Sequence, residues 1–189
     1  MKKVVFSLIC SILVTISFAD CAKYTKKQIQ IDSKLQAVKV NNTFSGQACV
    51  ASDNLILYRG DSRATSEIFK DGFKLKETSK QALANIKMES EWKDMLGVGS
   101  GGFTDNGIST ALSENTAKTY TTNCTYIIDS KGLTPISVEA TVNHYENKSN
   151  DLGDEILFIK DIPNTRIIGC KPKNGSSVIK NPSYNGNFK

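Results

Sequence analysis

The sequence feature that most constrains the fold is an apolar strand signal that runs directly into an arginine-containing polar segment. Leu55-Ile56-Leu57-Tyr58 has the aliphatic and aromatic character of a β-strand, and Arg59-Gly60-Asp61-Ser62-Arg63 follows at once. A strand of this kind needs partners that bury its apolar side chains. The chain is therefore expected to build a sheet that holds a cationic group at one strand end.

Further strand and helix signals follow along the chain, separated by Asp, Ser, Gly, Asn and Pro residues. Strands are predicted over 108–110, 125–128, 136–142, 156–159 and 166–170. Short helices are predicted over 65–70, closed by Gly72, and over 113–120. The alternation of short strands with short helices indicates one mixed α and β domain.

A longer helix is predicted from about Lys80 to Leu96, with capping-box spacing at Thr78 and Gln81 and a stop at Gly97. Trp92 lies on its apolar face, where a core anchor is favoured over a ring that stacks on a substrate. The glycine-rich segment that follows, 97–107, matches neither a P-loop nor a Rossmann fingerprint. It is interpreted as a loop, either an active-site flap or plain surface.

The N-terminus has the pattern of a secretory signal peptide, with Lys2 and Lys3 before an apolar stretch and small residues at Ser17 and Ala19. Cleavage after Ala19 would leave 189 minus 19, or 170 residues, enough for one domain. The predicted organisation is a signal peptide (1–19), an N-terminal extension with one short helix (20–48), a catalytic domain (49–170) and an irregular, polar, basic tail (171–189). The expected location is secreted or periplasmic, with no transmembrane segment in the mature chain.

Charge and cysteine content narrow the classes of function. The formal net charge is +5, and without the two lysines of the leader it becomes 22 minus 19, or +3, which is too low for a nucleic-acid-binding signature. Four cysteines remain after the leader and would form two disulfides in an oxidising compartment, with three connectivities open: Cys21, Cys49, Cys124 and Cys170. No CxxC pair is present and His144 is the only histidine, so no metal site is predicted.

Three segments, taken in order, resemble the pertussis- and cholera-toxin-like mono-ADP-ribosyltransferases of the Arg-Ser-Glu class. They are Tyr58-Arg59-Gly60-Asp61-Ser62-Arg63, Ser109-Thr110-Ala111, and the stretch from Glu155 through eight residues to an Ile162-Pro163 turn. The acidic helix and glycine turn after the first segment, 67–73, also match. The resemblance covers about 54–170.

The resemblance implies an α+β fold of the ADP-ribosyltransferase type, in which two small, mainly antiparallel sheets flank an NAD cleft. It implies that Glu155 stabilises the positive charge that develops on the ribose when NAD is cleaved. Arg59 would hold the pyrophosphate, and Ser109 would fix the rotamer of Glu155. Tyr58, Gly60 and Thr110 complete the expected NAD-binding set. NAD is expected as substrate.

The acceptor side departs from the family. Two residues before the glutamate the family carries glutamate or glutamine, whereas this chain has Gly153. Asp154, Asp151 and His144 are the remaining candidates for that side. The expected activity is transfer of ADP-ribose to an unidentified macromolecule by a secreted toxin or effector. An NAD glycohydrolase and a non-catalytic binding module stay as alternatives. Action inside a foreign cell would need a separate delivery subunit, with the basic tail as one docking segment.

Overall fold

The computed structural model describes residues 21–27, 29–31, 35–98 and 106–186. The strands are β1 (Gln36–Lys39), β2 (Ser45–Ala48), β3 (Ile56–Asp61), β4 (Ile108–Ala111), β5 (Cys124–Asp129), β6 (Ile136–Ser137), β7 (Glu155–Phe158), β8 (Ile167–Pro172) and β9 (Ile179–Lys180). The α-helices are α1 (Thr65–Asp71), α2 (Glu77–Asn85), α3 (Glu89–Met95), α4 (Glu114–Lys118) and α5 (Val138–Glu146), and the 3-10 helices are η1 (Cys21–Tyr24) and η2 (Asn164–Arg166).

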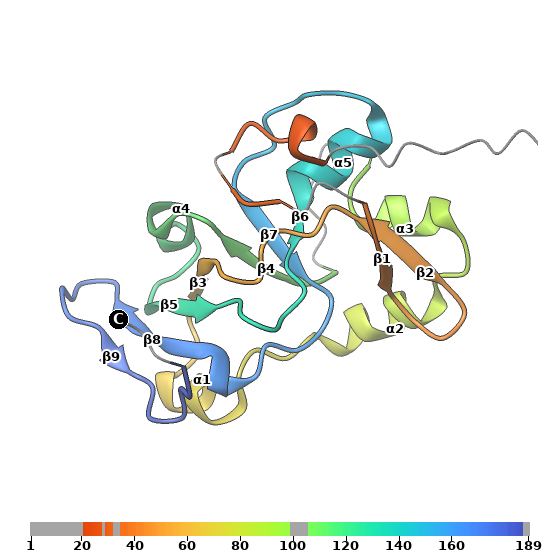
Figure 1. Cartoon of the computed structure of the whole chain (residues 1–189). Helices are drawn as coiled ribbons and strands as arrows, with labels where there is room; N and C mark the ends of the chain where they lie inside the picture. Colours follow the sequence, from red (N-terminus) through yellow and green to blue (C-terminus); the bar gives the residue numbers. More distant parts are fainter. Residues whose placement is uncertain (1–20, 28, 32–34, 99–105, 187–189) are drawn as a thin grey trace, which may run out of the picture.

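These strands form two antiparallel sheets of unequal size. β1 and β2 make a hairpin, and the other seven strands follow the order β6-β7-β4-β3-β5-β8-β9. Figure 1 shows the hairpin with α2 and α3 on one side of the larger sheet, and α5 with η1 at another edge. No helix among the described residues is long and apolar enough to cross a membrane.

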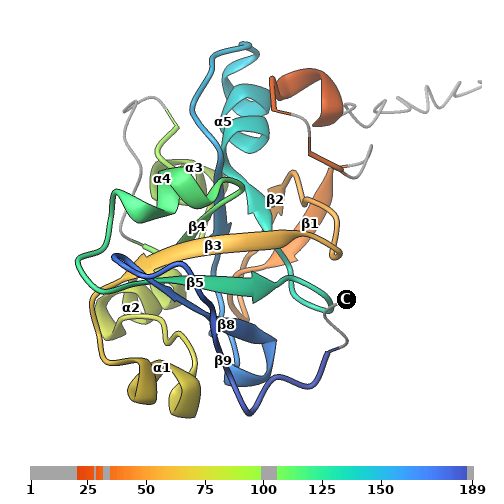
Figure 2. The same ribbon diagram turned by 90° about the vertical axis from the view of Figure 1, so that its left-hand side faces the viewer.

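The larger sheet has a narrow joint between β3 and β4. These strands pair only at Tyr58 and Ala111, whereas β3 and β5 pair over six positions and β4 and β7 over four. The sheet therefore consists of two parts, β6-β7-β4 and β3-β5-β8-β9, which meet at one residue pair. Figure 2 shows β3 and β5 crossing in front of the molecule, with α1 and α2 below them.

The strand predictions hold where apolar residues form a continuous buried run. β5 is buried over almost its whole length, and β7 and β8 also bury their central residues. α1 ends as predicted at Gly72, whose φ of 74° suits glycine. α4 lies within the predicted 113–120 segment, and the Ser113 hydroxyl accepts hydrogen bonds from the first-turn N–H groups.

The single helix predicted from Lys80 to Leu96 is wrong, because the chain forms α2 and α3 with a break between them. Ile86 is extended and only 4% exposed. Asn41 of the β1–β2 hairpin donates to the carbonyls of Leu83 and Ile86, both at 2.7 Å. The Glu91 carboxylate accepts from Met88 N at 3.1 Å and so starts the new helix. Tertiary contacts satisfy the backbone groups that the break exposes.

The strand predicted over 136–142 is also wrong after Ser137. The Ser137 hydroxyl accepts from Ala140 N at 3.2 Å and begins α5. Residues 138–143 are all buried, so alternating apolar residues do not distinguish a strand from a helix here. The polar members of this buried helix, Glu139, Thr141 and Asn143, have hydrogen-bond partners in other segments.

Both ends of the described chain are more ordered than the sequence predicts. The N-terminal extension contains the β1–β2 hairpin as well as the short helix η1, and Trp92 packs on it as a core residue, with Nε1 donating to Gln47 O at 3.0 Å. The expected irregular tail instead supplies β9, and buried Asn181 donates to the carbonyls of Asn164 and Ile167.

The leader (1–19) and most of the glycine-rich loop (99–105) lie outside the described residues. The domain boundaries stay predictions.

Two disulfides resolve the open connectivity. Cys21 pairs with Cys49, and Cys124 pairs with Cys170. The first joins η1 to the end of the hairpin, and the second joins neighbouring strands β5 and β8. All four cysteines are 0 to 1% exposed. The first bridge therefore ties the N-terminal extension to the main domain.

Candidate active site

Three predicted residues from separate strands meet at the joint between the two parts of the larger sheet. Arg59 on β3 donates from Nη1 to the carbonyl oxygen of Ser109 on β4, at 2.6 Å. The Ser109 hydroxyl donates to Oε1 of Glu155 on β7. The residues are separated by 50 and 46 positions in sequence. Ser109 thus contacts the arginine through its main chain and the glutamate through its side chain.

The strand register explains why these residues meet. Ala111 faces Tyr58 on one side and Glu155 on the other, so the joint brings β3 and β7 against the same residue of β4. Ser109 lies two residues before Ala111 and therefore on the same face of β4. Thr110 lies on the opposite face, is 4% exposed, and donates to the carbonyl of Ile156 at 2.8 Å. Its hydroxyl holds β4 to β7 rather than pointing to the Ser109 face.

Gly60 allows α4 to approach β3 closely. A Cβ at this position would lie 2.2 Å from the carbonyl oxygen of Ala117 and 3.1 Å from Cβ of Thr121. A backbone oxygen cannot rotate away as a flexible side chain can. The glycine beside Arg59 is therefore required by packing, and α4 is seated directly on the strand that carries the arginine.

Asp61 and Phe73 hold the guanidinium of Arg59, and sequence reasoning gave neither residue this role. Oδ2 of Asp61 lies 3.6 Å from Arg59 Nε, and the Asp61 carboxylate accepts from Arg63 Nε and Nη2 at 2.9 and 2.8 Å. The ring of Phe73 lies 5.2 Å from Cζ of Arg59. The signal for both residues was present in the matched 58–63 and 67–73 segments, but their contacts depend on tertiary structure.

The electrostatics of this cluster favour an ionised Asp61. Burial by itself would raise the pKa of this carboxyl, but hydrogen bonds from Arg63 and the charges of Arg63 and Arg59 hold the pKa below its usual value. In return, the hydrogen bond to Asp61 raises the pKa of Arg63. One buried carboxylate therefore neutralises part of the positive charge at the arginine site.

The acceptor-side candidates occupy different environments. Gly153 has a φ of 91°, and a Cβ there would meet nothing within 4 Å. The Asp154 carboxylate accepts from Ser113 N at 3.0 Å and from the Thr116 hydroxyl at 3.1 Å, so it holds the start of α4. Asp151 is 54% exposed. A backbone N–H from Gly153 and an ion pair with Lys27 keep its pKa below the usual value.

His144 lies on α5, the helix that forms where the sequence predicted the end of the 136–142 strand. Its ring packs edge-on against Tyr24 and Tyr145, with centroid distances of 5.3 and 5.5 Å. Burial, followed by the nearby positive charges of Lys23 and Lys93, lowers its pKa. The histidine therefore belongs to the contact between α5 and the N-terminal segment.

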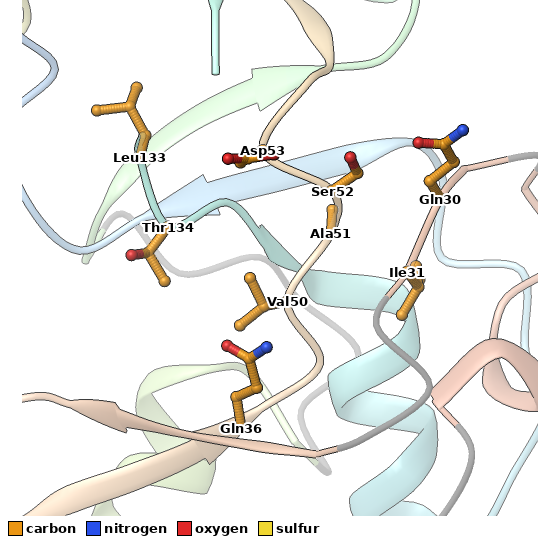
Figure 3. A pocket seen from close by; sticks show the side chains of 9 residues that line it. All are labelled: Gln30, Ile31, Gln36, Val50, Ala51, Ser52, Asp53, Leu133 and Thr134. Carbon is orange, nitrogen blue, oxygen red and sulfur yellow. The ribbon is translucent and has the colours of Figure 1, made fainter. Parts of the chain in front are cut away.

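A surface cavity of about 440 Å³ lies apart from these candidates (Figure 3). Its lining comes from the chain just before β1 and the first residue of β1, the connection between β2 and β3, and the loop before β6. The residues are Gln30, Ile31, Gln36, Val50, Ala51, Ser52, Asp53, Leu133 and Thr134. None of these is a predicted site residue. The convergence of Arg59, Ser109 and Glu155, rather than this cavity, defines the candidate active site, because one serine contacts a cation through its carbonyl and a carboxylate through its hydroxyl.

Comparison with solved structures identifies the architecture. A variant of the Scabin toxin from Streptomyces scabies aligns with a TM-score of 0.51 and 16% identity, covering 88% of this chain and 86% of that one. The chain has an ADP-ribosyltransferase fold. Scabin in complex with NADH (TM-score 0.49, 16% identity, 88% and 86% covered) and a guanine-specific ADP-ribosyltransferase (0.48, 19%, 88% and 88%) are also similar. No family model and no curated protein sequence matches the chain.

The predicted fold class is thereby confirmed, including its short helices and antiparallel sheets. At these identities the likeness concerns the fold alone. Function has to be argued from the side chains of this protein.

Proposed function

We propose that this protein cleaves NAD and transfers ADP-ribose to a macromolecular acceptor, as an enzyme of the Arg-Ser-Glu class. The observation that carries the proposal is the double contact of Ser109 with Arg59 and Glu155. The sequence order of these residues predicts a shared site, and the fold brings them into contact. A cation and a carboxylate linked through one serine suit a substrate that carries phosphates and develops positive charge at a sugar.

The proposed reaction breaks the bond between ribose C1′ and the nicotinamide nitrogen. The electron pair of this bond leaves on the ring nitrogen, so nicotinamide departs as a neutral molecule and positive charge develops on the ribose. The Glu155 carboxylate stabilises that charge, and the Ser109 hydroxyl keeps the carboxylate in one rotamer. A nucleophilic atom of the acceptor forms the new bond to C1′ and releases its proton to solvent or a nearby base.

Glu155 stabilises positive charge, whereas Arg59 binds the negatively charged pyrophosphate of NAD. Its guanidinium lies against Ser109 O, the Asp61 carboxylate and the Phe73 ring. These contacts hold the guanidinium plane in place before the substrate arrives. A preorganised guanidinium loses less side-chain entropy when it grips a phosphate.

An NAD glycohydrolase is the second candidate, and the acceptor side favours it. Gly153 supplies no side chain, and the Asp154 carboxylate is engaged by α4. Neither residue is then placed to activate a protein or nucleic-acid nucleophile, and water would complete the reaction. A secreted, non-catalytic binding module on the same scaffold is the third candidate, from a different class.

NAD labelled in its adenosine half separates these candidates, with and without cell lysate or nucleic acid. Label on a macromolecule supports transfer, free ADP-ribose alone supports hydrolysis, and neither turnover nor NAD binding would leave the binding module. Glu155→Gln keeps the shape of the side chain but removes its charge, so the rate of NAD cleavage should fall roughly 10²- to 10³-fold. Glu77→Gln, an equal charge change on the exposed start of α2, is the control. Near-normal cleavage by a folded Glu155→Gln protein would refute the role of this residue.

Export is part of the same proposal. The signal-peptide pattern and the two buried disulfides support an oxidising destination outside the cytosol. Action in a target cell would need a separate delivery subunit. Immunodetection of the mature chain in culture supernatant, with its N-terminus sequenced, tests the predicted cut after Ala19.

A further inference from the structure

The N-terminal segment 21–27 packs against the loop that leads into Glu155. Cys21 is held by its disulfide to Cys49, and Tyr24 is 8% exposed against the ring of His144. The Glu139 carboxylate on α5, 3% exposed, accepts from the Thr25 hydroxyl and from Lys26 N. Burial of a carboxylate requires such donors. The segment is thus fastened to α5 at successive residues.

Asn143 links this segment to the loop 147–153. It is 0% exposed, and its Nδ2 donates to the carbonyl of Tyr24 at 2.9 Å and to the carbonyl of Asn150 at 2.8 Å. Asn150 N donates back to the Asn143 Oδ1 at 3.0 Å. A single buried amide therefore joins two segments that have no covalent connection nearby, and both hydrogen-bonding groups of the amide are used.

A second link lies at the surface, three residues further along segment 21–27 and one residue further along the loop. Lys27 Nζ lies 3.4 Å from Asp151 Oδ1, and the same oxygen accepts from Gly153 N at 3.1 Å. Gly153 has a positive φ and stands two residues before Glu155. Lys27 is therefore linked, through the Asp151 carboxylate, to the backbone N–H of Gly153, two residues before the proposed catalytic carboxylate.

The position of this loop matters because of what Glu155 does in the proposed reaction. An incoming nucleophile must come within about 3–3.5 Å of the C1′ that Glu155 faces. The chain neighbours of Glu155 then border the path of that nucleophile. We propose that segment 21–27 is a bracket that positions loop 147–153 and thereby sets which nucleophile reaches C1′, with Asn143 as the positioning residue. This inference rests on the proposed function.

Thr25→Val and Lys27→Gln test the bracket without touching Arg59, Ser109 or Glu155. Each removes one fastening, so amide hydrogen exchange in 147–153 should become about fivefold faster. Lys26→Gln is the matched control: the exposed Lys26 donates its backbone N–H to Glu139, and the charge of its side chain has only the smallest of the effects on the Asp151 carboxyl. Asn143→Ala should give a larger change, with its thermal unfolding measured alongside because this residue is fully buried.

Methanol serves as a probe nucleophile in the same variants, because it competes with water for the ribose and needs no knowledge of the natural acceptor. The ratio of methyl ADP-riboside to ADP-ribose should shift about twofold or more, while KM for NAD stays unchanged. Faster exchange with an unchanged product ratio would overturn the role in nucleophile choice. Unchanged exchange, or an equal effect of Lys26→Gln, would overturn the bracket. Wild-type protein that does not cleave NAD would overturn the proposed function instead, and the exchange data would still decide whether the bracket holds the loop.

Discussion

Gly60→Ala is the change that most directly tests how the fold supports the candidate site. The new Cβ would stand 2.2 Å from the carbonyl oxygen of Ala117 on α4. Carbon and oxygen normally keep about 3.3 Å or more apart. Either β3 or α4 must therefore move by about 1 Å, because the contact is with main chain and no side-chain rotation can relieve it.

The cost follows from the kind of contact. Overpacking a close-packed interior costs about 1–3 kcal/mol, and a clash with a backbone atom belongs at the upper end of this range. For a protein of this size each kcal/mol lowers Tm by roughly 2–4 °C, so Gly60→Ala should lower Tm by about 6–12 °C. Because α4 also holds Asp154 through Thr116, its displacement should reduce kcat for NAD cleavage.

Thermal and urea unfolding followed by circular dichroism, with both disulfides intact, measure this cost. Gly153→Ala is the matched control, because its Cβ would meet nothing within 4 Å and only the φ of 91° opposes the side chain. That backbone strain costs about 1–2 kcal/mol. A Gly60→Ala protein as stable as wild type, or more stable than Gly153→Ala, would refute the argument that α4 is seated on Gly60.

Substitutions at three further residues address the charged groups. Arg59→Lys should raise KM for NAD about tenfold or more, because lysine keeps the charge but lacks the planar fork that grips phosphate; wild-type kcat/KM at low NAD would contradict this. Asp61→Asn should cost about 2 kcal/mol at pH 7, discounted for the 40% exposure of Arg63. Since the folded pKa of Asp61 is depressed, the stability that its carboxylate contributes is complete above the ordinary pKa of 3.8 and is lost as pH falls through the folded pKa. The unfolding free energies of wild type and variant should therefore converge in acid. Asp154→Ala should reduce kcat about tenfold with KM for NAD little changed, while Asp154→Asn keeps an acceptor for Thr116 and should retain most activity; equal kinetics of the two would refute a positioning role.

Strands with unbroken apolar runs could be predicted from the sequence because their burial has a local signature. β5 and β8 are buried over most of their length, and α1 carries its glycine stop at Gly72. The break at Ile86 had no such signature, since it depends on the hydrogen bonds that Asn41 donates from the hairpin. Patterns within one segment do not report a partner from another.

The helix α5 shows a second limit of sequence patterns. Its six residues from Val138 to Asn143 are all buried, including three polar ones, because the N-terminal segment covers it and supplies partners. A strand and a fully buried helix give the same apolar alternation over so short a range. The N-terminal extension therefore changes how this part of the sequence should be interpreted.

The candidate site could be predicted from sequence only to the extent that it depends on residue type. The Ser109 hydroxyl contacts Glu155, and only residues whose side chain carries a hydrogen-bond donor could make that contact. The Ser109 carbonyl contacts Arg59, and every residue has such a group, so nothing in the sequence marks this contact. It arises because β3 and β4 pair only at Tyr58 and Ala111, which leaves the arginine beside a β4 carbonyl just past the joint. The same serine is thus recognised by its side chain and used through its backbone, and the second use belongs to the topology of the sheet.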